Sequence, residues 1–335
     1  MSMNLLEYLR CKTQVDLDSF DVTVTKEFGQ CIDCTSNQVF SLRQYEYYTE
    51  LAKPNKKKIL QKATEFTTQL HDQFPEVTFE ELAVEVGAVL LGHEMLPAFK
   101  RDLHIMANPR YAYSQPKVVE AAKRIHRISA VIDPSFPTSR IVIKVPATWE
   151  GMQACRELRP CGVKTLATTV FSMEQAVLAG EAGCVSISPF VHALRILVEP
   201  EYRDPHPLLD LCVQAQRWYQ QESLPTKVKA CSTVGVDELL QLAGVDALTL
   251  MPDDLRALQS KQREAAEVAG MSLFESGVSV EANIKYDSYI DDETKYRLHF
   301  ERADRGGAQA RLAEAIDIFR GYQAKAEDVI RSVKV

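Results

Sequence analysis

Short runs of β-forming residues recur along the chain, and helical patterns separate most of them. Eight such runs occupy residues 12–17, 30–34, 103–107, 140–145, 165–170, 184–188, 227–232 and 246–251. Strands that alternate with helices favour a parallel sheet. Eight repeats favour one closed (β/α)8 barrel of the TIM type, with additional helices, over an open doubly wound sheet, because no glycine-rich phosphate-binding turn follows the first run. We therefore expect a single domain over residues 1–335.

The helical segments carry recognisable ends and faces. The pattern "MEQAVLAGEAG" stops at a glycine, as helix C-termini often do. The last helix is expected at about 308–333 and packed on the barrel. Its apolar side chains repeat at helical spacing and form one stripe, made of Leu312, Ile316, Phe319, Ala326 and Ile330.

Composition excludes several classes of protein. The 335 residues carry a net charge of −7 and no long run of Lys and Arg, so we expect no nucleic-acid partner. No apolar stretch approaches the ~18 residues of a membrane span, and the N-terminus lacks an apolar signal core. These features predict a cytoplasmic protein. Cys31 and Cys34 form a lone CxxC, which supports a zinc site only weakly; we expect reduced, mostly buried thiols and no metal.

Lys144 interrupts an apolar strand, "RIVIKV". It shares one face with Arg140 and Val142 and would point into the barrel mouth. Burial disfavours the ammonium, and the neutral amine can attack a carbonyl to form a Schiff base. The alternative is a lysine paired with a neighbouring carboxylate. Lys164 and Lys229 are rival candidates, but both lie near strand starts, where the face of a barrel is structural.

Polar residues follow or end six of the predicted strands. In a barrel the carboxyl ends of the strands meet at one mouth, where the chemistry takes place. We therefore expect one site that contains Asp18, Asn37, Lys144, Thr168, Ser188 and Ser232.

With these residues placed, the sequence resembles the transaldolase family over nearly its whole length. "LRCKTQVDLDSFD" resembles the family's first strand, which ends in a catalytic aspartate. "DCTSNQVF" is similar to D-A-T-T-N-P-S, and "RIVIKVPATWEGMQACREL" to R-I-L-I-K-x-A-S-T-W-x-G. "TLATTVFSMEQAVLAGEAGCVSISPFV" resembles the segment that ends in I-S-P-F-V.

The resemblance implies a class I aldolase that holds a dihydroxyacetone unit on a lysine and passes it between sugar phosphates. It places the Schiff-base lysine at Lys144 and the general acid/base at Asp18, with Thr168 positioning a water. Asn37 and Ser188 would orient substrate oxygens, and Phe190 and Ser232 would also contact the substrate.

Four positions depart from the family pattern. The family has a glutamate that activates water where this chain has Met106, and an asparagine where it has Leu166. Two arginines that hold the substrate phosphate are replaced by Ala193 and Val234. A phosphate needs a charged clamp, whereas methionine and leucine suit an apolar ligand. We expect these four residues to shape a drier pocket.

Three hypotheses follow. The first is an enzyme of the transaldolase type, acting as a lyase or transferase on a less polar, non-phosphorylated small carbonyl compound, in secondary metabolite biosynthesis rather than in central carbohydrate metabolism. The second is a pentose-phosphate transaldolase whose phosphate is held by Arg195 and Arg110. The third is a catalytically silent barrel that binds a metabolite or a partner protein. Lysine chemistry needs no cofactor. Barrels of this kind often form homodimers, although no pattern in this sequence indicates one.

Overall fold

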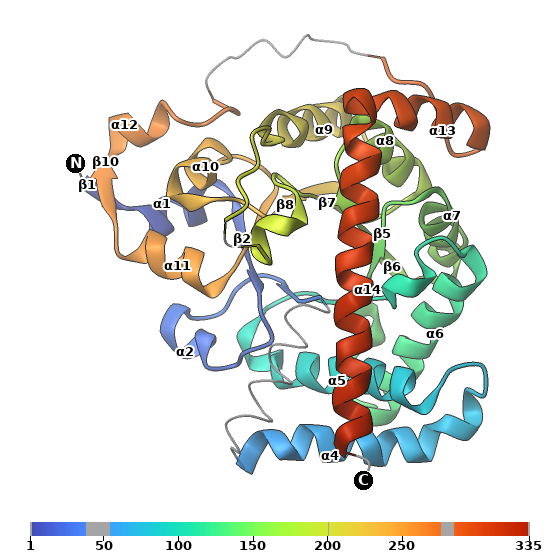
Figure 1. Ribbon diagram of the computed structural model, residues 1–335. Helices are drawn as coiled ribbons and strands as arrows, with labels where there is room; N and C mark the ends of the chain where they lie inside the picture. The colour runs from blue at the N-terminus through green and yellow to red at the C-terminus, as the bar shows by residue number, and fades with distance from the viewer. Residues whose placement is uncertain (1, 38–53, 200, 276–284, 334–335) are drawn as a thin grey trace.

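The computed structural model describes residues 2–37, 54–199, 201–275 and 285–333. Its centre is a closed barrel of eight parallel strands in the order β2 to β9 (Figure 1). The strands are Gln14–Asp18 (β2), Cys34–Thr35 (β3), Leu103–Met106 (β4), Ile141–Pro146 (β5), Lys164–Val170 (β6), Ser186–Pro189 (β7), Lys227–Ala230 (β8) and Ala247–Leu250 (β9). Each of them overlaps one of the eight predicted runs, which confirms the (β/α)8 barrel.

Helices cover the outside of the barrel. Between β3 and β9 the helices are α4 (Pro54–Leu70), α5 (Phe79–Glu94), α6 (Gln115–Ile132), α7 (Trp149–Leu158), α8 (Met173–Ala182), α9 (Leu209–Gln221) and α10 (Gly235–Gln241), and α11 (Pro252–Gln259) follows the last strand. The short helices α1 (Leu5–Lys12), α2 (Val24–Phe28), which lies between β2 and β3, and α12 (Ala265–Ala269) lie on the left in Figure 1. Thr148 begins α7 and Ser172 begins α8, because each side-chain oxygen accepts a backbone hydrogen bond. Helix α8 ends at Gly183, whose φ of +79° suits glycine, as predicted.

Strand β5 is buried along its whole length, as expected for a strand inside a parallel barrel. Ile141 and Ile143 join the hydrophobic core. Lys144 lies between Met106 of β4 and Leu166 of β6 in the strand register, so these three side chains share one face of the sheet. The register therefore directs Lys144 to the inside of the barrel.

Helix α14 (Gly307–Val333) crosses the molecule from α13 (Glu293–Arg302) to α4 (Figure 1). It packs against α5 and against the short 3-10 helix Leu194–Leu197 that follows β7. All five residues of the predicted apolar stripe are buried: Leu312, Ile316, Phe319, Ala326 and Ile330. The sequence thus predicts both the extent of this helix and the face that it buries.

A second, two-stranded sheet joins the start of the chain to a segment far along it. Strand β1 (Ser2–Asn4) pairs antiparallel with β10 (Gln262–Glu264). The sequence does not predict this pair. Within the described ranges, no helix is long and apolar enough to cross a membrane.

All eight cysteines are free thiols, and six of them, including Cys31 and Cys34, are buried. Burial raises the pKa of both Cys31 and Cys34, which keeps them in the thiol form. No group of three His, Cys, Asp or Glu side chains that could hold a metal ion occurs among the residues that the structure describes.

Candidate active site

A narrow cavity lies at the carboxyl ends of the barrel strands. Seven of the predicted site residues line it: Asp18, Asn37, Lys144, Leu166, Ser188, Phe190 and Ser232. They come from β2, β5, β6 and β7 and from the residues that follow β3, β7 and β8. The convergence expected from the sequence is therefore present in the structure.

Lys144 is buried, with only 5% of its surface exposed. Its ammonium makes no hydrogen bond or ion pair with any residue in the described part of the chain. The alternative that a carboxylate is paired directly with it does not hold there. A buried lysine without a partner is costly to the fold, because burial penalises its charged form. Such a position is typical of a lysine kept for chemistry.

Asp18 faces the same cavity from the end of β2. Burial raises the pKa of Asp18 to about 6, Lys144 acts to lower it, and Asp254 adds a smaller upward effect. Its Oδ1 has no hydrogen-bond partner among the described residues. A carboxyl group that titrates close to neutral pH is suited to take up and release protons.

Several other buried polar atoms next to this cavity lack a partner among the described residues. These are Thr35 Oγ1, Thr168 Oγ1 and Ser186 Oγ. Thr35 is paired with Asp18 in the register of β2 and β3, and Ser186 with Leu166 in that of β6 and β7. Buried polar groups normally have partners, so a cluster of open ones points to a polar ligand in the barrel mouth.

The backbone is strained at two strand ends. Thr169 and Ser232 have φ values of 58°, which non-glycine residues rarely adopt. Thr169 lies at an irregularity of the register between β6 and β7, and Ser232 itself lines the cavity. Strain of this kind concentrates at functional sites.

A hydrogen bond and ring packing hold Ser188 and Phe190 on one side of the cavity. Ser188 Oγ donates a hydrogen bond of 3.1 Å to the carbonyl oxygen of Lys229 and lies 3.3 Å from Cys231 Sγ. Phe190 packs edge-on against Phe171, with ring centroids 5.7 Å apart. Burial raises the pKa of Cys231 to about 12, so this cavity-lining sulfur is a neutral thiol.

Four of the predicted site residues do not line this cavity. Thr168 is buried in β6, where it is paired with Ser188. Met106 lines a separate, largely apolar cavity that also contains Asn37, Val84 and Ala326. Because Met106 is next to Lys144 in the register, the two cavities are neighbours. Leu166 therefore lines the cavity that contains Lys144, whereas Met106 lines the neighbouring apolar cavity.

Ala193 and Val234 are not among the described residues that line this cavity. Val234 is 48% exposed and begins α10, because the chain turns away from the barrel after Ser232. Ala193 is buried beside the cavity and does not line it.

Carboxylates accept hydrogen bonds from the backbone N–H groups of Ala193 and Val234. The N–H of Ala193 donates to Asp204 Oδ2 at 2.8 Å, and the N–H of Val234 donates to Glu238 Oε2 at 2.6 Å. His192 lies between the two acids, 2.9 Å from Glu238 and 3.6 Å from Asp204. Asp204 is paired with Arg311 at 3.0 Å, so the charge of Glu238 is the less compensated of the two.

Neither candidate arginine lines the cavity. Arg195 pairs with Glu199 at 2.7 Å and Glu314 at 3.6 Å. Arg110 forms a two-pronged contact with Glu327, at 2.6 and 2.9 Å. Lys144 is the one lysine or arginine among the cavity-lining residues that the structure describes.

Sequence reasoning missed six residues that line the cavity: Thr35, His104, Leu194, Leu197, Cys231 and Thr249. A signal for two of them was present. Thr35 precedes Asn37 by two residues and His104 precedes Met106 by two, so each has the side-chain direction of a residue already singled out. Leu194 and Leu197 lie in a 3-10 helix that no strand pattern predicts.

The other two candidate lysines, Lys164 and Lys229, both form ion pairs with carboxylates. Lys164 pairs with Asp102 at 3.1 Å. Lys229 Nζ lies 2.6 Å from both Asp16 Oδ2 and Asp33 Oδ2 inside the barrel. Burial acts to lower the pKa of Lys229, but these two carboxylates outweigh it and raise that pKa. Both lysines are therefore structural, as their positions near strand starts predict.

The fold and the cavity define a (β/α)8 barrel protein with a lysine and an aspartate at the C-terminal mouth, where barrel enzymes have their active sites. The family model for transaldolase/fructose-6-phosphate aldolase matches residues 15–301, and the chain belongs to this family. Similar curated proteins include a transaldolase of Glaesserella parasuis, 30% identical over 78% of this chain and 81% of its own. A transaldolase of Buchnera aphidicola is 29% identical over 77% and 80%. Transaldolase 2 of Salmonella paratyphi A is 27% identical over 98% and 99%.

Proposed function

We propose that the protein makes or breaks a carbon–carbon bond through a Schiff base on Lys144. The observation that carries this proposal is the buried Lys144 ammonium, which faces the cavity without a hydrogen-bond or ion-pair partner in the described chain, across from Asp18. Membership of the family supports an aldolase or transferase.

In the proposed reaction the neutral amine of Lys144 adds to a ketone carbonyl, and loss of water gives an iminium ion. Asp18 then removes the proton from the hydroxyl group next to the bond that breaks. The bonding electrons move to the iminium, which becomes an enamine, and an aldehyde leaves. The enamine either takes up a proton or attacks a second aldehyde, and hydrolysis restores the lysine.

The other polar residues suit a substrate rich in hydroxyl groups. Asn37 and Ser232 line the cavity, and the open hydroxyl of Thr35 lies next to Asp18 in the register. Ser188 is already held by the Lys229 carbonyl, which fixes its oxygen as an acceptor toward the cavity. In the proposed reaction Thr168 positions a water molecule.

Two substrate classes are candidates. The names of the relatives, all called transaldolase, favour transfer of a dihydroxyacetone unit between sugar phosphates, and they give no support to a setting in secondary metabolism. The site geometry favours a carbonyl substrate without a phosphate.

The charges at the barrel mouth support the second candidate, a carbonyl substrate without a phosphate. A phosphate dianion binds to free N–H groups and guanidinium groups. At Ala193 and Val234 the backbone N–H groups are already bound to carboxylates. Asp204 is paired with Arg311, and the negative charge of Glu238 repels a phosphate. A cytoplasmic location and a homodimer remain predictions.

Reductive trapping tests the proposal. The protein is incubated with fructose 6-phosphate or with fructose, which differ only in the phosphate, and any imine is reduced with borohydride and located by peptide mass mapping. We expect an adduct on Lys144 and none in Lys144→Ala, whose circular dichroism should be unchanged. Turnover retained in Lys144→Ala would refute the Schiff base.

The matched ketoses separate the substrate classes. A Lys144 adduct that forms faster with fructose 6-phosphate supports sugar-phosphate transfer and contradicts the electrostatic argument. An adduct that forms equally well or faster with fructose supports a non-phosphorylated substrate. If neither these ketoses nor the small ketone dihydroxyacetone gives an adduct, a silent barrel that binds without reacting is supported.

A further inference from the structure

His104 is a second titratable residue in the cavity wall. It lies in β4, two residues before Met106, and it lines the same cavity as Asp18 and Lys144. Its register neighbours are Thr35 of β3 and Val142 of β5, which places it one step deeper in the barrel than Lys144. Only 3% of its surface is exposed.

His104 contacts a buried network of charged side chains made of Asp33, Lys229 and Asp16. His104 Nε2 lies 3.7 Å from Asp33 Oδ2, and that oxygen also contacts Lys229 Nζ at 2.6 Å. Lys229 in turn contacts Asp16. The charged groups that act on His104 are therefore Asp33, Lys229 and Asp16, from three other segments of the barrel.

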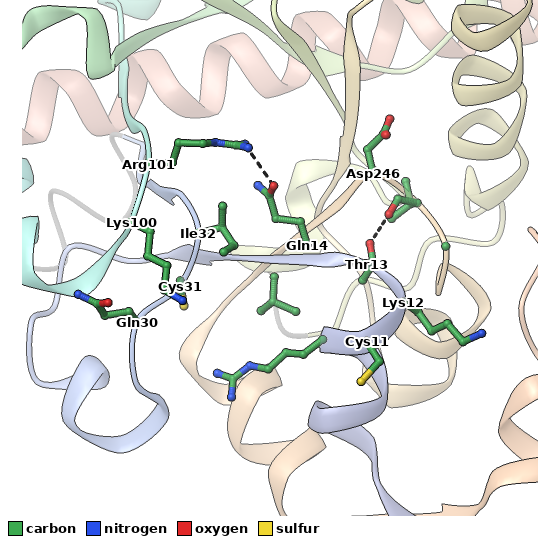
Figure 2. Close-up of a pocket in the computed structure, with 14 residues that line it drawn as sticks. Cys11, Lys12, Thr13, Gln14, Gln30, Cys31, Ile32, Lys100, Arg101 and Asp246 are labelled. Carbon is green, nitrogen blue, oxygen red and sulfur yellow. Dashed lines mark hydrogen bonds between the residues drawn. The ribbon is translucent and has the colours of Figure 1, made fainter.

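The network continues to the N-terminal end of the barrel. Gln14 donates to Asp16 at 2.7 Å, and Arg101 donates to Gln14 at 3.1 Å and to Asp33 at 3.2 Å. Figure 2 shows the Arg101–Gln14 bond in the open groove at that end. Asp33 is thus held by several donors, which fixes the position of the carboxylate beside His104.

These surroundings keep the imidazole neutral. Burial lowers the pKa of His104, and Lys229 acts in the same direction, while Asp33 only partly opposes them. Burial acts to raise the pKa of Asp33, but His104 and Lys229 outweigh it and keep that carboxyl ionised. A neutral imidazole can accept a proton, and the fixed carboxylate of Asp33 offsets part of the cost of the imidazolium that forms.

The chemistry at Lys144 needs more than one proton-transfer group. A carbinolamine must lose its oxygen as water, and hydrolysis of the iminium needs a base to activate water, apart from the hydroxyl deprotonation given to Asp18. Among the described residues that line the cavity, the groups that titrate are Asp18, His104, Lys144 and Cys231, and the last is a neutral thiol.

We infer that His104 is the residue that moves protons to and from water during imine formation and hydrolysis, with Asp33 as its positioning residue. In hydrolysis the water oxygen bonds to the iminium carbon while one water proton passes to the neutral imidazole. The imidazolium then returns that proton to the carbinolamine nitrogen. As the carbon–nitrogen bond breaks, the imidazole takes the remaining hydroxyl proton, which leaves the carbonyl and the free amine, and later releases this proton to solvent. Imine formation runs through the same steps in reverse, so no oxidant or other reactant is needed. This inference rests on the proposed Schiff base at Lys144.

Timed trapping with dihydroxyacetone isolates this step, because that ketone forms an imine without a bond to cleave. The protein and ketone are mixed at a series of pH values and quenched at intervals with borohydride, and the reduced adduct is measured by intact mass. In His104→Gln we expect adduct formation at pH 7 to be about 100-fold slower or more, the usual size of a general acid–base effect. The acid side of the log rate against pH should have a slope smaller by one proton than in the parent protein.

Two further variants make the test decisive. Asp33→Asn should shift the apparent pKa of the acid limb while the slope stays that of the parent, as expected for a positioning residue. His126→Gln is the matched control, because His126 on α6 is another histidine whose pKa is lowered by burial and it does not line the cavity. It should match the parent protein in rate and slope.

The outcomes separate the two proposals. A His104→Gln protein that folds, as judged by circular dichroism, and traps dihydroxyacetone with the rate and slope of the parent overturns the role of His104 and leaves the Schiff base standing. Absence of an adduct on Lys144 in the parent protein overturns the Schiff base itself. If His104→Gln fails to fold, His104→Asn gives the same measurement with a smaller side chain.

Discussion

The ammonium of Lys229 lies 2.6 Å from the carboxylate of Asp16 inside the barrel, while Lys144, one layer higher, has no such partner in the described chain. Both lysines are buried to a similar degree, at 5% exposure each. Lys229 therefore stabilises the fold, whereas Lys144 is available for chemistry. The predictions below follow from this difference.

Lys229→Met is expected to destabilise the protein by about 3–5 kcal/mol, because it removes the ion-pair partner of the buried Asp16 and leaves Asp33 with Arg101 and His104. The measurement is the free energy of unfolding in urea. Lys164→Met is the control: Lys164 pairs with Asp102 but its side chain is 38% exposed, so its loss should cost about 1 kcal/mol or less. Equal losses in the two variants would contradict the assigned role of Lys229.

Lys144→Met is expected to stabilise the protein, in contrast to Lys229→Met. The substitution removes a buried ammonium that has no ion pair among the described residues and replaces it with an apolar side chain of similar length. We expect the free energy of unfolding to rise by about 1–2 kcal/mol, the common size of a gain where function is given up. Thermal unfolding of the variant and the parent at the same pH measures it. A marked loss of stability would mean that Lys144 supports the fold.

Asp18→Asn is expected to stabilise the protein in a pH-dependent way. Because the pKa of Asp18 is raised to about 6, the folded state binds its proton more tightly than the unfolded state, so Asp18 costs stability as the pH rises from about 4 through 6. A shift of roughly two units corresponds to about 3 kcal/mol at pH 7. The difference in unfolding free energy between variant and parent should therefore grow from pH 4 to pH 7. A constant difference would disprove the raised pKa.

Glu238→Gln should change the choice of substrate if the Lys144 reaction is confirmed. The substitution keeps an oxygen that can accept the Val234 N–H but removes a negative charge from the mouth. We expect kcat/KM for fructose 6-phosphate, relative to that for fructose, to increase about 5-fold, the effect of about 1 kcal/mol of lost repulsion. Glu222→Gln at the end of α9 removes the same charge elsewhere and should leave the ratio unchanged. An unaltered ratio in Glu238→Gln would count against the electrostatic argument.

The barrel could be predicted because its signals are local. Each strand is an apolar run bounded by a helix, and the burial of β5 around Lys144 follows from the residues themselves. The pairing of β1 with β10 could not be predicted, because Ser2 and Glu264 are brought together by the closed barrel and by no pattern of their own. Element type is a local property, whereas a contact between distant segments is not.

The site shows the same division. Lys144 and Asp18 were found because each stands at a strand end. Val234 lies outside the cavity lining because strand β8 ends at Ala230 and the backbone of Ser232, at a positive φ, redirects the chain before Val234 is reached. Asp204 and Glu238 were missed because they come from a connection and a helix, and only the folded chain shows that they bind the N–H groups of Ala193 and Val234.

Helix α14 has a consequence for synthesis of the chain. The ribosome makes it after every barrel strand, yet its Ala326 lines the apolar cavity beside Met106, and the helix packs on α5. A nascent chain can thus complete its barrel while this wall and the apolar side of α5 are still open to water. Until α14 is made, a chaperone that holds nascent chains could bind this apolar surface, and a chain that stopped before Gly307 would contain Lys144 but lack this wall.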